Sequence, residues 1–177
     1  MKIKLVNARL SFPSLFEATS FEGSKPSFKA TFILDKKKDA AKIAEINKAI
    51  DAMIAEKWKG KVTRAKLKGV CLRDGEEKAD MDGYGDDVMF ISSASLKRIP
   101  VVDGDLSPLS AQDNKPYAGC YVNGTIELWV QDNDFGKRIN AQLRAVQFSK
   151  NGDPFGVKEA NPEEEFDKVE ESADDVV

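Results

Sequence analysis

The sequence of 177 residues contains no histidine and only two cysteines. Histidine is the commonest general base of enzymes and the commonest zinc ligand, so its absence excludes every His-based catalytic triad. Two cysteines without histidine cannot make a four-ligand structural zinc site of the usual kind. An enzyme built from this sequence would have to use carboxylates, lysines or hydroxyls alone. We therefore expect a binding protein with no catalytic residues and no metal site.

Long apolar stretches are also missing. The longest run without a charged residue, Pro116 to Ile126, has 11 residues, whereas a membrane-spanning helix needs about 20 apolar residues. Residues 2–12 alternate charge and apolarity, unlike a signal peptide. We expect a cytoplasmic protein with no membrane segment, in which Cys71 and Cys120 stay reduced. Glycine-rich phosphate loops and dinucleotide fingerprints are absent, and no cofactor is predicted.

Charge is divided unevenly along the chain. The formal net charge is −3, yet residues 159–177 hold nine acidic residues and one lysine, which leaves residues 1–158 with a net charge of +5. A basic body with an acidic tail is typical of a protein that binds nucleic acid and uses the tail for interactions. We expect one domain over residues 1–157 and a disordered acidic tail over residues 158–177, which has too little apolar surface to fold by itself.

Hydrophobic periodicity predicts a mainly β domain with one or two helices, of the α+β class. Period-two alternation indicates strands over residues 2–12 and 28–34, and helical spacing indicates a helix from Asp35 or Asp39 to Gly60. Shorter strands are expected at residues 67–72, 88–92 and 99–102. Several short strands, one early helix and a long final hairpin favour an OB-like Greek-key barrel, with the helix after the second strand.

The clearest predicted element is a hairpin at the end of the domain. Residues 117–130 and 137–148 alternate in polarity on either side of the turn-forming segment 132–136. We predict that Leu128 pairs with Ile139, which joins the two apolar faces into one core face. The expected core residues of the second strand are Ile139, Ala141, Leu143 and Ala145. On the outer face this register pairs Trp129 with Arg138 and Asn123 with Arg144.

A basic segment provides the first sign of a nucleic-acid surface. Residues 57–73 hold seven cations and no acid, and neutralising phosphates with such cations releases counterions and drives binding. A charge run alone more often marks a solvated surface, but here the rest of the body is nearly neutral. The candidate backbone contacts are Lys57, Lys59, Lys61, Arg64, Lys66, Lys68 and Arg73, together with Lys97 and Arg98.

Aromatic residues on the outer face of the hairpin provide the second sign. Exposed rings stack on bases, with each contact worth about 1–3 kcal/mol whatever the base. The stacking candidates are Tyr117, Tyr121 and Trp129, with Arg138 and Arg144 beside them, and further candidates are Phe12, Phe16 and Tyr84. An alternative of about equal weight is that the helix, or the second subunit of a homodimer, covers this face. Trp58 lies four residues after Ile54 on the apolar side of the helix, so we expect it to pack in the core.

Two rival functions are open at this level. The acidic run Asp80, Asp82, Asp86 and Asp87 would be the centre of a metal-dependent nuclease. It lacks the spacing and the terminal glutamate of a calcium-binding EF-hand loop, so a solvated loop is several times more expected. The other rival is a protein–protein adaptor, or an inhibitor that mimics DNA with its acidic tail.

The sequence also resembles a known family. The segments that carry the resemblance are RLSFPSLFEA at 9–18, DGYGDDVMFISSASLKRIPVVD at 82–103, YAGCYVNGTIELWV at 117–130 and RAVQFSKNGDPFG at 144–156. They are similar to a family of phage and prophage single-stranded DNA-binding proteins. The resemblance implies an OB-fold like that of podoviral single-stranded DNA-binding proteins, and a role in phage DNA replication or recombination. It also implies single-stranded DNA as partner, and we expect the tail to recruit replication or recombination proteins.

Overall fold

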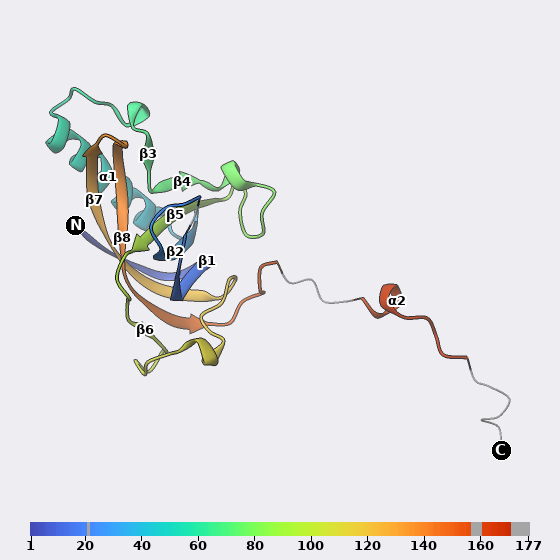
Figure 1. The fold of residues 1–177 in the computed structure, drawn as a ribbon. Coiled ribbons are helices and arrows are strands. Elements are labelled where there is room, and N and C mark those ends of the chain that lie inside the picture. Colours follow the sequence, from blue (N-terminus) through green and yellow to red (C-terminus); the bar gives the residue numbers. More distant parts are fainter. Residues whose placement is uncertain (21, 157–160, 171–177) are drawn as a thin grey trace, which may run out of the picture.

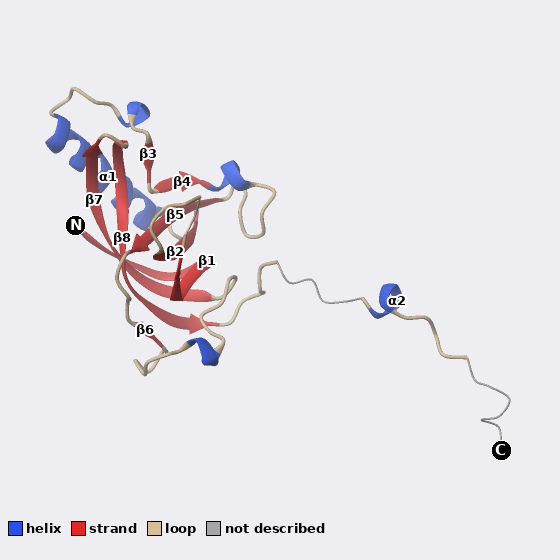
Figure 2. Cartoon of the chain, viewed as in Figure 1, coloured by secondary structure: helices blue, strands red, loops and turns tan. Residues whose placement is uncertain are grey.

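Five strands close a barrel in the order β1, β2, β5, β8, β7 and back to β1 (Figure 1). The computed structural model describes residues 1–20, 22–156 and 161–170. The strands are β1 (Lys2–Thr19), β2 (Ser27–Asp35), β3 (Gly69–Val70), β4 (Leu72–Asp74), β5 (Val88–Ser95), β6 (Val101–Val102), β7 (Tyr121–Asn133) and β8 (Gly136–Lys150). The helices are α1 (Ala40–Trp58), α2 (Pro162–Glu165) and the short 3₁₀ helices η1 (Arg64–Lys66), η2 (Gly75–Lys78) and η3 (Ala111–Asp113). The expected OB-like barrel, with its helix after the second strand, is confirmed (Figure 2).

Closure depends on one parallel contact between β5 and β8, where Ala94 is the partner of Gln142. The other four barrel pairings are antiparallel. Inward residues of the five strands make one apolar core, whose largest fully buried side chains include Phe32, Leu34 and Ile126. Gly124 lets the Phe32 ring lie against the β7 backbone, because a Cβ there would approach that ring to 2.4 Å.

Helix α1 adds one apolar face to this core. Ile46, Ile50 and Ile54 are buried at helical spacing, and the helix ends in a left-handed residue, Lys59, followed by Gly60. Trp58 is only 7% exposed, as expected for a core residue, and its Nε1 donates to Asp132 Oδ2 at 3.0 Å. The helix therefore packs on the inner side of the hairpin strands and leaves their outer side open.

The hairpin register differs from the prediction by two residues. Leu128 pairs with Ala141 instead of Ile139. The cross-strand partners on the outer face are Trp129 with Asn140 and Asn123 with Gln147, so the predicted pairings with Arg138 and Arg144 are wrong. The strands continue to Asn133 and Gly136 and leave a turn of two residues, whereas the sequence suggested five. Between the turn and Ile126 the shift is two residues, which keeps each side chain on its face. The alternation of this part of the hairpin could therefore not distinguish the two registers.

A β-bulge corrects a second detail of the hairpin. The pairing shifts between Thr125 and Ile126, where Arg144 is the extra residue of β8. Beyond the bulge the core-facing positions become Val146 and Phe148. The prediction that Ala145 belongs to the core is wrong. A bulge inserts one residue into one strand and so reverses which side chains point inward.

The acidic tail is described only over residues 161–170. Its side chains are exposed there, and one helical turn begins after Asn161, whose Oδ1 accepts from the Glu163 backbone N–H at 3.1 Å. Three glutamates in that first turn favour it, since a helix N-terminus attracts negative charge. The disorder expected for the rest of the tail, at residues 158–160 and 171–177, falls outside the described residues. No helix in the described part of the chain is long and apolar enough to cross a bilayer.

Candidate nucleic-acid interface

A basic groove of about 490 Å³ lies where β3, β4 and β5 meet the hairpin strand β8. Lys68 and Arg73 reach it from the two sides of β3, and Arg138 and Asn140 reach it from β8. The parallel pairing of Gly69 with Arg138 brings these distant segments together. Three of the cations predicted from the sequence thus converge on one groove, which is the main feature of this surface.

The charges of the groove are only partly neutralised. Arg73 makes two hydrogen bonds to the Glu77 carboxylate, at 3.0 and 3.2 Å. Arg138 has no carboxylate partner among the described residues, and Lys68 Nζ donates to the backbone carbonyl of Phe135 at 3.0 Å. Three cations against one carboxylate leave an electropositive groove, which suits a phosphate backbone.

Small and uncharged residues form the rest of the groove. Ser92 and the amide of Asn140 add hydrogen-bonding groups to the groove. Cys71 also lines the groove, but burial raises the pKa of its thiol to about 11. The thiol therefore stays protonated at neutral pH and is a poor nucleophile.

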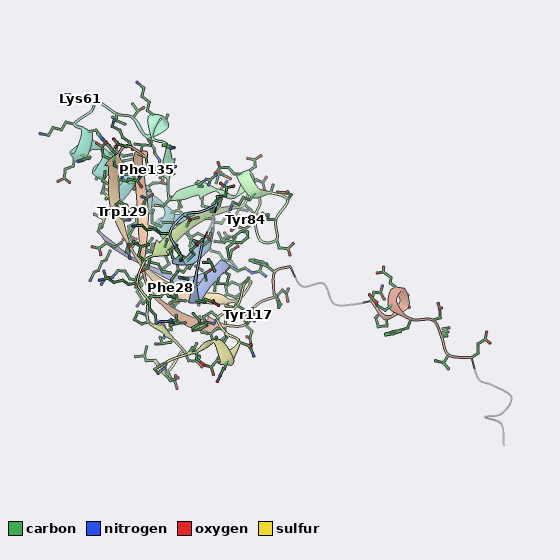
Figure 3. The ribbon with its side chains drawn as sticks, in the orientation of Figure 1. Phe28, Lys61, Tyr84, Tyr117, Trp129 and Phe135 are labelled. Carbon is green, nitrogen blue, oxygen red and sulfur yellow. The ribbon has the colours of Figure 1, made fainter. Side chains whose placement is uncertain are left out.

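Trp129 lies on the outer face of β7, next to Asn140 and therefore beside the groove. Its side chain is 44% exposed. The alternative in which the helix covers this face is therefore wrong. Phe135 at the hairpin tip is 75% exposed and was missed in the sequence analysis, although a single ring in an otherwise polar turn was the available signal. Figure 3 shows Trp129, Phe135 and Lys61 on the same side of the molecule.

The remaining cations of the basic segment surround the hairpin tip. Lys57, Lys59, Lys61 and Lys66 are exposed on the end of α1, the following loop and η1. Arg64 is held by Asp51 at 3.4 Å. These residues extend the positive surface beyond the groove.

Other predicted site residues lie away from the groove. Arg144 is paired with Glu127 at 2.8 Å. Arg98 donates to the Phe16 carbonyl at 3.0 Å, and Lys97 is exposed beside it at the far end of β5. The sequence grouped these cations by charge alone, whereas the barrel separates them.

The two tyrosines of the predicted stacking face do not lie with Trp129. Tyr117 precedes β7, and its hydroxyl donates to Asn151 Oδ1 at 3.0 Å, which fixes the segment after β8. Tyr121 borders a second groove of about 620 Å³, where Lys150 Nζ lies 4.8 Å from its ring centroid. That groove mixes acids with cations, among them Asp35 and Asp87, so it is less suited to a polyanion.

The acidic loop between η2 and β5 is tied to the barrel by hydrogen bonds from outside the loop. Lys36 Nζ donates to Asp74 Oδ2 at 2.8 Å and to the backbone carbonyl of Asp86 at 2.6 Å. Asp82 accepts from the Gly156 backbone N–H at 2.9 Å. Among the residues with described positions, no three Cys, Asp or Glu side chains gather to hold a metal ion. The aspartates expected for the nuclease alternative therefore do not converge.

Comparisons with known proteins found a matching family model and a similar phage protein. The family model described as "Enterobacter phage Enc34, ssDNA-binding protein" matches residues 1–177. A protein of Acyrthosiphon pisum secondary endosymbiont phage 1, called putative protein p50, is 41% identical over 96% of this chain and 94% of its own length.

Solved structures point the same way. The single-stranded DNA-binding protein of bacteriophage Enc34, solved in complex with ssDNA, superposes with a TM-score of 0.77 at 28% identity, covering 88% of this chain and 89% of that one. The single-stranded DNA-binding protein gp2.5 of bacteriophage T7 has the same fold, with a TM-score of 0.56 at 13% identity over 98% of both chains. The chain belongs to the family of the Enterobacter phage Enc34 ssDNA-binding protein.

Proposed function

We propose that this protein coats single-stranded DNA without sequence preference and without catalysis. The observation that carries the proposal is the groove in which Lys68, Arg73 and Arg138 converge beside the exposed ring of Trp129. Cations that follow the backbone and rings that stack on any base are the two components of non-specific single-strand binding. The family of the chain supports the same conclusion.

The position of the groove on the fold adds support. OB-folds bind oligonucleotides on the face of the second and third barrel strands, between the loops that flank it. In this barrel those strands are β2 and β5, and the final hairpin provides one flanking loop. Ser92 of β5 and Arg138 of the hairpin both line the groove. The groove therefore adjoins β5, one of the two strands on which OB-folds bind oligonucleotides, and this position supports the proposal.

The first test is a titration of labelled oligo-dT, with duplex of the same length as competitor. We expect single strands to bind well ahead of duplex, and affinity to fall steeply with salt because counterions are released. Lys68→Gln should lower affinity and reduce the salt slope by about one. Lys48→Gln, an exposed lysine of α1 outside the groove, is the matched control and should bind as the wild type does. Equal affinity for both DNA forms would contradict the proposal.

We further propose that the protein acts in phage DNA replication or recombination in the host cytoplasm, where the acidic tail recruits partner proteins. Residues 161–170 present exposed acidic side chains, which suits a basic surface on a partner. The check is to coat primed single-stranded template with full-length protein or with protein truncated after Val157. Equal stimulation of a replicative polymerase by both would contradict recruitment through the tail.

A homodimer that covers the outer face of the hairpin is the alternative to base stacking on that face, because it would bury the ring that DNA needs. Trp129 and Phe135 are the exposed apolar residues that such a contact would bury. Light scattering over a concentration series measures the oligomeric state, and a monomer at all concentrations would contradict this alternative.

A further inference from the structure

Phe12 is exposed by a bulge in β1. The strand pairs regularly with β2 up to Ser11, and the register shifts before Ser14. Phe12 itself has a φ of 45°, a left-handed conformation that is unfavourable for a residue with a bulky side chain. Its ring is 51% exposed, and it is not among the residues that pack on either core cluster. A bulge that holds an aromatic residue in an unfavourable backbone conformation and points its side chain outward is typical of a functional position.

A second ring stands next to Phe12. The centroid of the Tyr84 ring is 6.3 Å from that of Phe12, with the planes tilted by 37°. Tyr84 is fixed, because its hydroxyl donates to Ser11 Oγ at 2.9 Å and its ring meets the buried Phe90 edge-on at 5.2 Å. The loop between η2 and β5 thus supplies a rigid partner to the exposed ring.

A cation completes this cluster. Lys78 Nζ lies 5.0 Å from the Phe12 centroid and 5.7 Å from the Tyr84 centroid. Within the described residues it forms no ion pair with a carboxylate. Its charge is therefore available to an anion from outside the chain.

The cluster also adjoins the basic groove. Arg73, which lines the groove, has its guanidinium carbon 5.5 Å from the Phe90 ring centroid, and Lys78 Nζ lies 5.2 Å from the same ring. Two cations around the buried Phe90 ring therefore lead from the groove to the exposed Phe12 ring and the partly buried Tyr84 ring. Figure 3 shows Tyr84 well apart from Trp129. The start of β1 pairs beside Trp129, at Lys2 with Glu127, and ten residue steps separate Lys2 from Phe12. Fully extended they would span at most roughly 33 Å, and the bulge at Asn7 shortens this distance.

We propose that Phe12 and Tyr84 form a second base-stacking site for single-stranded DNA, in which Lys78 binds the flanking phosphate. The inference rests on the proposed function, since it extends the DNA path from Trp129 through the groove to the β1 bulge. A base stacks on the open face of the Phe12 ring, and the ammonium of Lys78 neutralises the backbone next to it. A strand too short to reach the bulge uses only the groove.

The experiment measures affinity against oligomer length, with oligo-dT from 4 to 16 nucleotides, about the range of site sizes known for one OB-fold. The variants are Phe12→Leu and Tyr84→Leu, which remove a ring but keep an apolar side chain. Phe12→Tyr keeps the ring and should bind as the wild type does. Phe166→Leu removes an exposed ring on the tail, away from the site, and is the control. We expect each leucine variant of the site to lose about 5- to 150-fold on the longest oligomer and nothing on the shortest.

A second measurement separates stacking from a merely structural role. Oligomers that carry 5-iododeoxyuridine crosslink under ultraviolet light to rings that touch the base, and peptide mapping identifies the ring. We expect long oligomers to crosslink Phe12 or Tyr84, and short ones to crosslink only Trp129. Crosslinks to Trp129 alone at every length, with unchanged affinity of both leucine variants, would overturn the second site but leave the proposed function intact. If the wild type binds no oligomer, the proposed function itself fails.

Discussion

Replacing Trp129 by alanine should weaken binding to single-stranded DNA while leaving the barrel folded. The ring is on the outer face of β7, where it is 44% exposed and borders the basic groove. If about 250 Å² is taken for a tryptophan side chain, the part open to a base amounts to roughly 110 Å². At about 25 cal/mol per Å² this area is worth close to 3 kcal/mol when a base covers it. That value is an upper estimate and agrees with about 1–3 kcal/mol for one stacked base.

The effect of the same substitution on folding should be smaller than that of a core substitution. Truncation of a buried aromatic residue costs about 3–5 kcal/mol, and we expect that loss for Trp58→Ala, since Trp58 is 7% exposed and donates to Asp132. Trp129 is half outside, so Trp129→Ala should cost roughly 1–2 kcal/mol, a modest part of the about 5–15 kcal/mol that stabilises a typical domain. Urea unfolding of the two variants compares these costs directly.

The assay uses the fact that the chain has only two tryptophans. A Trp58→Phe variant leaves Trp129 as the single tryptophan, and oligo-dT should quench its emission as a base stacks on the ring. A Trp129→Phe variant leaves the buried Trp58, whose emission should stay unchanged while anisotropy reports binding. The reasoning is refuted if Trp129 emission is constant while DNA binds, or if Trp129→Ala keeps full affinity with its fold intact.

Three further predictions follow from charge and burial. Truncation after Val157 should raise affinity for oligo-dT at low salt, because the acidic tail competes for the groove at an effective concentration in the millimolar range. The gain in affinity should shrink as salt screens the charges of the tail. Identical affinities of full-length and truncated protein at low salt would contradict the competition. A hydrogen bond from Lys36 lowers the pKa of Asp74, so the stabilisation from Asp74 is present above its unfolded pKa of about 3.9 and is lost as pH falls through the lower folded value. The difference in stability between wild type and Asp74→Asn in urea melts should therefore be largest at pH 7 and shrink as Asp74 is protonated in acid. A difference that does not change with pH would refute this assignment. The Cys71 thiol, with its pKa of about 11, should resist alkylation by iodoacetamide at pH 8 in the folded protein and react in urea, as mass spectrometry can show; rapid alkylation of the native protein would contradict its burial.

The sequence determined the parts of the fold that depend on local pattern. Alternation along β2 and the hairpin, and the isoleucine spacing of α1, each require one apolar face, and those faces form the core. The packing of Trp58 followed from the same spacing. The order of these elements also predicted an OB-like barrel, because few arrangements of strands and one helix are compatible with that order.

The exact pairing within the hairpin was decided by tertiary structure. An even shift in register keeps the side-chain pattern, so only the two-residue turn after Asn133 and the bulge at Arg144 fix it. The bulges of β1 are of the same kind, since the sequence around Phe12 shows no glycine to mark a left-handed residue.

The site divides in the same way between sequence and structure. Composition alone identified the excess of cations in residues 57–73 and the aromatic residues of the hairpin, because charge and ring type are properties of each residue. Which of them act together depends on the barrel: the parallel pairing of β3 with β8 brings Lys68 to Arg138, and ion pairs withdraw Arg144 and Arg64. Convergence in space between residues 70 positions apart is set by strand pairing, and no local pattern in the sequence encodes that distance.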